Sequence, residues 1–116
     1  MLEKPAFIQG VFEFEGRGLN SPVSFPTPAI YKVPADKRAQ TIYFRAGNAS
    51  SEMIYLVLTR SGDPMRYFPL GAKSSVHVAL AVLEDIPPGS TIELLVAAPQ
   101  GIKSSVVVDV GFMEIA

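Results

Sequence analysis

The sequence contains no cysteine and a single histidine, His77. The missing cysteine excludes disulfide bonds, thiolate metal sites, iron–sulfur clusters and cysteine nucleophiles. One histidine excludes a two-histidine metal site within one chain, and as a general base it would need a carboxylate partner, for which Glu93 and Asp109 are candidates. It shares a strand face with Ala79 and Ala81, which favours a packed histidine with a structural or interface role. We therefore expect no metal, no cofactor and no enzymatic activity.

Charged residues are also scarce. They make up 18% of the chain, against roughly 25% in typical domains, and the 10 basic and 11 acidic residues leave a net charge of −1. Because they are scattered singly, we expect neither a nucleic acid nor an anionic membrane surface as a partner. The chain lacks the ~18-residue apolar run of a membrane-spanning helix. Met1 to Pro5 does not resemble a signal peptide, so a cytoplasmic location is expected.

What is abundant is apolar residues broken up by proline and glycine. The 116 residues are 48% hydrophobic and include ten prolines and nine glycines. A chain of this length typically forms one domain, here expected to span residues 1–116. So many prolines and glycines are incompatible with a helical bundle and indicate short strands joined by turns.

Eight runs rich in β-branched and aromatic residues are separated by Gly, Pro, Asn or Asp. Their spacing of roughly a dozen residues is typical of an antiparallel sandwich or barrel. We predict an all-β fold, an antiparallel two-sheet sandwich of jelly-roll or immunoglobulin-like type, with a barrel as the alternative. The runs are residues 7–15, 23–33, 41–46, 53–60, 65–70, 75–83, 91–98 and 104–115.

Three stretches of the sequence carry distinctive local signals. Residues 53–70 predict a β-hairpin whose turn lies within Ser61 to Pro64. Pro26 and Pro28 restrict residues 23–33 to a broken, edge-like strand, because proline cannot donate to a β-ladder. Residues 76–85 contain good helix formers, but their period-two alternation favours a strand over a helix.

Apolar side chains occupy both faces of three predicted strands. Residues 53–58 are apolar on both faces, residues 91–98 are interrupted only at Glu93, and residues 105–113 only at Asp109. A strand of a two-layer sandwich buries one face, so the apolar outer rows predict a further covering surface. The simplest source is a second copy of the chain. We expect a homo-oligomer, most simply a symmetric dimer, with Leu95 and Val107 in the interface.

Two interpretations of function follow. The first is a non-enzymatic interaction or structural module that acts as a homo-oligomer. The alternative is a module that binds a carbohydrate or another small ligand through polar and aromatic side chains at one end of the sandwich, since Arg binds anionic groups and Tyr stacks on sugars. A small hydrolase is a weaker third possibility. The same side chains could instead simply cover apolar edges. The candidate ligand residues are Arg45, Asn48, Arg60, Arg66 and Tyr67.

Overall fold

The computed structural model describes residues 3–80 and 84–116, and this part of the chain forms eight β-strands and no helix. It accordingly holds no helix that could cross a membrane. The strands are β1 (Lys4–Glu15), β2 (Val23–Lys32), β3 (Arg38–Asn48), β4 (Ile54–Arg60), β5 (Asp63–Leu70), β6 (Ser75–Ala79), β7 (Thr91–Ala97) and β8 (Lys103–Ile115).

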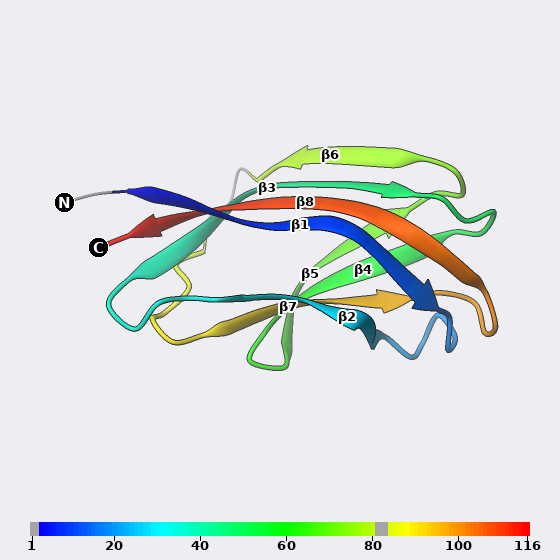
Figure 1. Ribbon diagram of the computed structural model, residues 1–116, viewed down its shortest axis with the longest axis horizontal. Helices are drawn as coiled ribbons and strands as arrows, with labels where there is room; N and C mark the ends of the chain where they lie inside the picture. Colours follow the sequence, from blue (N-terminus) through cyan, green and yellow to red (C-terminus); the bar gives the residue numbers. More distant parts are fainter. Residues whose placement is uncertain (1–2, 81–83) are drawn as a thin grey trace.

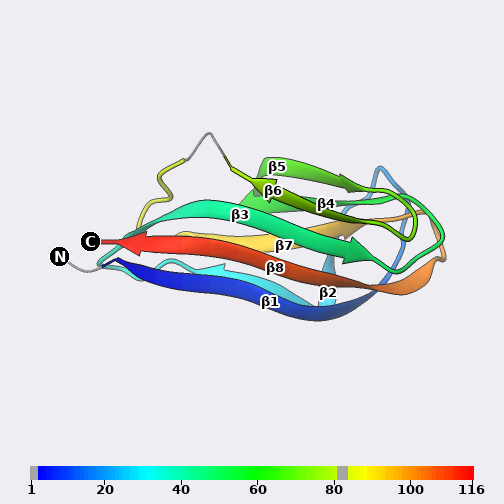
Figure 2. The same ribbon diagram turned by 90° about the horizontal axis from the view of Figure 1, so that it is seen from above.

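The strands form two four-stranded antiparallel sheets that pack face to face (Figures 1 and 2). Sheet A has the order β1-β8-β3-β6, and sheet B has the order β2-β7-β4-β5. Each connection crosses from one sheet to the other, except the hairpin that joins β4 to β5. This connectivity is that of a double-sheet jelly roll, so the predicted two-sheet sandwich is confirmed and the barrel alternative is not.

The β4–β5 hairpin is confirmed where the sequence predicted it. Arg60 pairs with Asp63, so Ser61 and Gly62 form a two-residue turn. Both turn residues have positive φ, 48° at Ser61 and 90° at Gly62. A two-residue turn with two positive φ angles matches the twist of the flanking strands, and glycine adopts such a conformation without steric cost.

The proline-rich strand is at an edge, as predicted. β2 is the outer strand of sheet B, and its pairing with β7 is interrupted by a register shift between Ser24 and Ala29. Pro26 and Pro28 fall inside that interruption, where no ladder hydrogen bond is required. The run predicted over residues 75–83 is a strand through Ala79, and its positions 81–83 lie outside the described residues.

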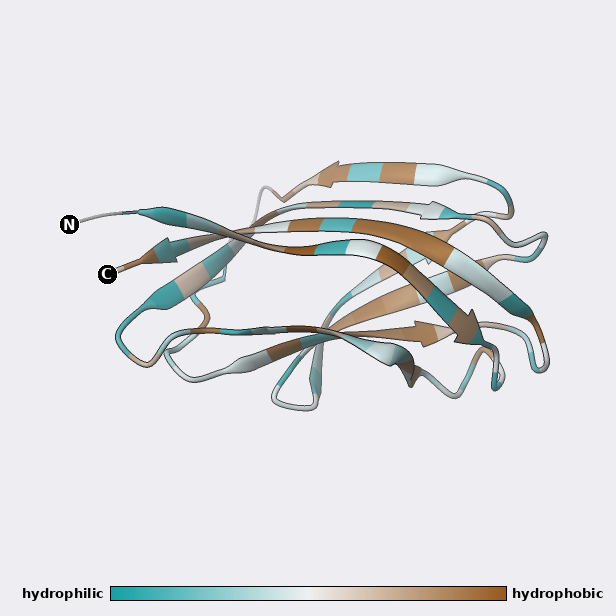
Figure 3. Ribbon diagram, viewed as in Figure 1, coloured by the Kyte–Doolittle hydropathy of each residue, from teal (hydrophilic) through white to brown (hydrophobic). Residues whose placement is uncertain are grey.

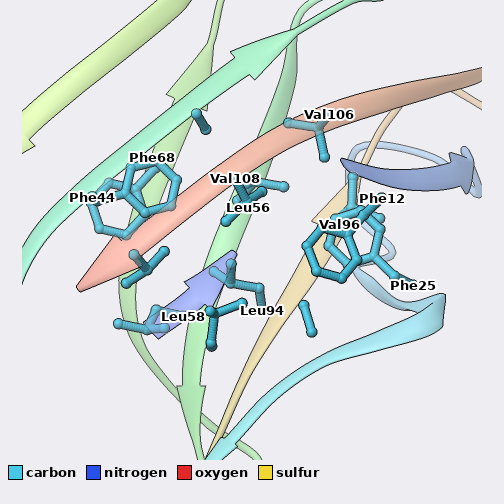
Figure 4. Close-up of a cluster of buried hydrophobic side chains, with 14 of the residues drawn as sticks. Phe12, Phe25, Phe44, Leu56, Leu58, Phe68, Leu94, Val96, Val106 and Val108 are labelled. Atoms are coloured by element: carbon cyan, nitrogen blue, oxygen red, sulfur yellow. The ribbon is translucent and has the colours of Figure 1, made fainter. Parts of the chain in front are cut away.

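The core lies between the two sheets (Figure 4). Alternate residues of β8, such as Val106 and Val108, point inward and are buried against the inward row of β4. Phe44 of β3 stacks on Phe68 of β5 with ring centroids 3.8 Å apart and planes at 4°. Aromatic and β-branched side chains from both sheets thus fill the space between them. Because side chains alternate along a strand, the residues between these inward positions point to the outer faces.

The apolar outer rows are only partly exposed in a single chain. In sheet B, Val57 lies in register between Leu95 and Tyr67 and is 2% exposed. In sheet A the outer position Gly111 lies beneath the ring of Tyr43, while Val107 is 54% exposed. Neighbouring side chains therefore supply part of the cover that we expected from a second copy. The homo-oligomer remains a prediction.

Candidate functional site

The outer face of sheet A carries a polar row that crosses all four strands. In register, Gln9 of β1 pairs with Asp109 of β8, Asp109 pairs with Arg45 of β3, and Arg45 pairs with His77 of β6. On both β6 and β8 a hydrophilic band lies between hydrophobic bands near the middle of the strand (Figure 3). Because side chains alternate between the faces of a strand, the inward Val108 and Val110 require Asp109 to point outward.

Asp109 is the hub of this row. Its Oδ1 accepts hydrogen bonds from Gln9 Nε2 at 3.0 Å and from the Tyr43 hydroxyl at 2.9 Å, and its Oδ2 accepts one from Arg45 at 2.5 Å. Partial burial alone would raise the pKa of Asp109, but the hydrogen bonds from Gln9, Tyr43 and Arg45 outweigh it and hold the pKa below its usual value. The carboxylate therefore stays ionised at neutral pH and serves as a hydrogen-bond acceptor.

Tyr43 lies flat on the sheet over a position that has no side chain. A Cβ on Gly111 would lie 2.1 Å from Cε2 of the Tyr43 ring, so only glycine leaves room for it. The guanidinium of Arg45 lies 5.2 Å from the ring centroid, and the His77 ring meets it edge-on at 6.2 Å. Burial and the hydrogen bond to Asp109 raise the pKa of the Tyr43 hydroxyl. Packing and hydrogen bonding thus fix these side chains before any ligand arrives.

A groove of about 660 Å³ opens beside this network. Its floor is Gly47, where an added Cβ would meet only the Cβ of Ser75, at 3.8 Å. Arg45, Asp109 and His77 line its polar end, and the exposed Val107 forms an apolar wall. The volume falls in the range of roughly 300–1,000 Å³ typical of small-ligand sites. Donors, acceptors and an apolar wall in one groove suit a ligand with both hydroxyl groups and C–H surfaces.

The groove continues past Gly47 toward the end of the sheet. A second hollow shares Gly47, Ser75 and Val107 with the first and extends to Lys73. The groove floor runs along the end of β3, from position 45 to position 49. At roughly 3.3 Å per residue, these four steps span about 13 Å along the strand. The combined groove therefore follows β3 for about 13 Å, which is long enough for an extended ligand.

The five predicted ligand residues do not gather at one end of the sandwich. Arg45 lines the groove on sheet A, whereas Tyr67 is on the outer face of sheet B, on the opposite side of the molecule. Asn48 is 3% exposed, and its Nδ2 donates to the carbonyls of Glu52 at 2.9 Å and Gly71 at 3.0 Å. The amide thus joins two loops. Asn48 is buried, whereas we expected it at an open surface from the sequence.

The other two arginines lie near the hairpin. Arg60 ends β4 next to the turn, in register with Asp63. Arg66 lies opposite Leu58, and thus on the inward row of the edge strand β5, where it pairs with Glu84 at 3.0 Å. A one-residue register shift follows Leu58, so Arg66 lies opposite Leu58 and Arg60 lies opposite Asp63.

Several residues of the site were not predicted as ligand contacts: Gly47, Ser75 and Asp109 line the groove, and Gln9 and Tyr43 donate hydrogen bonds to Asp109 beside it. A signal for Asp109 was nevertheless present, because it is the lone acid in the apolar run of residues 105–113. His77 is a groove residue rather than a core residue, and Arg45 separates it from Asp109, its predicted carboxylate candidate. Val107, predicted for an interface, forms a groove wall, and Leu95 is half-buried on sheet B.

Comparisons with known proteins identify similar folds. Neither the protein-family models nor the curated proteins gave a match. Among solved structures, the CBM36-1 domain of a multidomain xylanase from the hindgut metagenome of Trinervitermes trinervoides matches with a TM-score of 0.59 and 14% identity, covering 97% of this chain and 98% of that one. A carbohydrate-binding module CBM36 in complex with calcium and xylotriose matches with a TM-score of 0.58 and 12% identity, covering 97% and 99%. At this identity the likeness establishes a shared β-sandwich fold.

Proposed function

We propose that this chain is a non-enzymatic carbohydrate-binding module whose ligand lies in the groove over Gly47. The observation that carries the proposal is a pre-ordered polar row beside an open floor and an apolar wall, formed by Arg45, Asp109, His77 and Val107. Sugars present hydroxyl groups at the ring edge and C–H bonds on the ring face. Arg45 and Asp109 can bind the former, and Val107 can contact the latter.

The electrostatics make Asp109 unsuited to act as a general acid. A general acid for glycoside hydrolysis needs a carboxyl group whose pKa is raised so that it holds a proton near neutral pH. The pKa of Asp109 is lowered instead, because its hydrogen bonds outweigh the effect of its burial. Asp109 therefore acts as a fixed acceptor that orients Arg45 and Tyr43, which is a binding role.

The fold and the groove together support a carbohydrate as the ligand class. One of the similar structures contains xylotriose, and the groove has room for a short oligosaccharide, so xylo-oligosaccharides are the first probe. That structure also contains calcium. Within residues 3–80 and 84–116, no three His, Asp or Glu side chains gather closely enough to hold a metal ion, so the proposal uses protein groups alone.

Isothermal titration calorimetry with xylohexaose tests the proposal. Arg45→Ala should weaken binding about tenfold, the effect of losing a charged hydrogen bond of about 1.5 kcal/mol. Gly47→Val should block the groove floor. Arg17→Ala is the matched control, because Arg17 is also a surface arginine with an acidic neighbour, Glu15 at 3.7 Å. Unchanged affinity in both groove variants would refute the proposed site.

A further inference from the structure

The outer face of sheet B carries a pair of tyrosines that the groove does not use. Tyr55 of β4 and Tyr67 of β5 lie on neighbouring strands with ring centroids 6.0 Å apart and planes inclined at 49°. Tyr67 is 60% exposed, although a side chain of this size usually buries much of its surface. The two rings form one aromatic surface on the side of the molecule opposite the groove.

The surroundings of Tyr55 hold its ring in a fixed orientation. The Tyr55 hydroxyl donates to the carbonyl oxygen of Leu19 at 2.6 Å, so this ring is fixed in place. In register, Tyr55 lies between Ala97 and Pro69, whose side chains are short or compact. A fixed ring loses little conformational entropy when a ligand stacks on it.

Two consecutive register rows of this face consist of uncharged residues. One row is Ser24, Leu95, Val57 and Tyr67, and the other is Ala97, Tyr55 and Pro69. The adjacent row holds a carboxylate at Glu93, paired in register with Thr59, as an acceptor for hydroxyl groups. Aromatic and apolar rows bordered by one acceptor fit a neutral ligand with flat C–H faces.

We propose that this tyrosine face, defined by Tyr55, Tyr67 and Leu95, is a second sugar-binding surface that stacks on the pyranose faces of a neutral polysaccharide. The inference shares its ligand class with the proposed function and rests on it in that respect. A module with sugar sites on two opposite faces can contact two polysaccharide chains at once. Such bivalent contact raises retention on an insoluble polymer without any new contact at either site.

The size of the face favours a glycan over a second copy of the chain. Four strands at about 4.8 Å spacing and seven residues at about 3.3 Å each give a face on the order of 400 Å². A stable protein–protein contact buries about 800 Å² per partner. The face is therefore about half of what a dimer needs, while it accommodates a few sugar rings.

The test compares single variants on two ligands. Tyr67→Ala should lower affinity for insoluble xylan about tenfold in depletion isotherms, the effect expected when a stacking ring worth about 1.4 kcal/mol is removed. Tyr67→Phe keeps the ring and should bind like the wild type. Circular dichroism verifies that the variants fold. We expect Tyr67→Ala to fold normally, because the Tyr67 side chain is largely exposed. Arg45→Ala should weaken xylohexaose binding by the groove, whereas Tyr67→Ala should not.

The outcomes separate the two proposals. If Tyr67→Ala binds insoluble xylan as tightly as the wild type, the tyrosine face is not a sugar site, whatever the groove does. If Arg45→Ala leaves xylohexaose binding unchanged while Tyr67→Ala loses the insoluble polymer, the groove proposal fails and the tyrosine face stands. A dimer of the wild type in light scattering that Tyr67→Ala dissociates would overturn the second inference, because a second copy would then occupy the face.

Discussion

Replacing Gly111 by alanine should destabilise the protein, although the position faces outward. The new Cβ would lie 2.1 Å from Cε2 and 2.7 Å from Cδ2 of the Tyr43 ring, well inside the ~3.5 Å at which carbon atoms make favourable contact. The ring must leave the sheet surface, and its hydroxyl then loses the 2.9 Å hydrogen bond to Asp109. The substitution thus disrupts the polar row from beneath.

The magnitude combines three effects. Overpacking costs about 1–3 kcal/mol, and the hydrogen bond to a charged acceptor contributes about 1.5–3 kcal/mol before its solvent exposure is discounted. Alanine returns about 0.5–1 kcal/mol, because it loses less backbone freedom on folding than glycine does in a strand. Since the ring can swing into solvent and relieve most of the clash, we expect Gly111→Ala to lower the free energy of unfolding by about 2 kcal/mol.

Urea unfolding followed by circular dichroism measures this effect. With a slope of about 2 kcal/mol per molar urea, the midpoint should fall by about 1 M. Gly47→Ala is the matched control on the same face, because its Cβ would meet only the Cβ of Ser75 at an ordinary 3.8 Å. It should be neutral or stabilising by up to about 0.5 kcal/mol.

A double-mutant cycle tests the cause. In Gly111→Ala combined with Tyr43→Ala the ring is absent, so alanine at 111 should add no further destabilisation. Equal midpoints for Gly111→Ala and Gly47→Ala would refute the reasoning. The reasoning would also be refuted if the destabilisations of Gly111→Ala and Tyr43→Ala added fully in the double variant, because the clash with the ring would then not be the cause of the Gly111→Ala loss.

Three further predictions concern buried groups. Burial and the hydrogen bond to Glu114 raise the pKa of Tyr31, so above about pH 10 the folded state binds more protons than the unfolded state and stability should fall as pH rises. Tyr31→Phe should make this fall shallower in alkaline thermal melts, and the raised pKa of Tyr43 accounts for the part that remains. Asn48→Ala removes hydrogen bonds that join two loops and should cost about 2–3 kcal/mol in urea unfolding, whereas an unchanged midpoint would contradict its structural role. Phe44→Ala removes a fully buried ring and should cost about 3–5 kcal/mol by the same measurement; a loss below about 1 kcal/mol would refute its place in the core.

Much of the fold was predictable because it depends on local chemistry. The Ser61–Gly62 turn lies between two β-rich runs, and its positive φ angles are of the kind that glycine favours. Pro26 and Pro28 excluded a central position for their strand whatever its partners were. The inward row of β8 follows from period-two alternation, which also required Asp109 to point outward.

The candidate site depended on pairings that are remote in sequence. Gln9 and Asp109 are 100 residues apart, and Tyr43 and Asp109 are 66 apart, yet they share one hydrogen-bonded row. Arg45 and Tyr67 were expected to be close but belong to different sheets. Strand composition does not encode strand order, so the sequence could not show that the strands of Arg45 and Tyr67 lie in different sheets.

The sequence by itself determined that the chain forms β-strands, where most of them begin and end, and which side chains alternate inward, because propensity and period-two patterning act within a few residues. The tertiary structure decided the two-sheet jelly-roll order and thereby which outward rows became the groove and which became the tyrosine face. It also decided that Val57 and Gly111 are covered by neighbouring side chains. Those outcomes arise from register between strands distant in the chain, where a shift of one residue would exchange the buried and exposed faces.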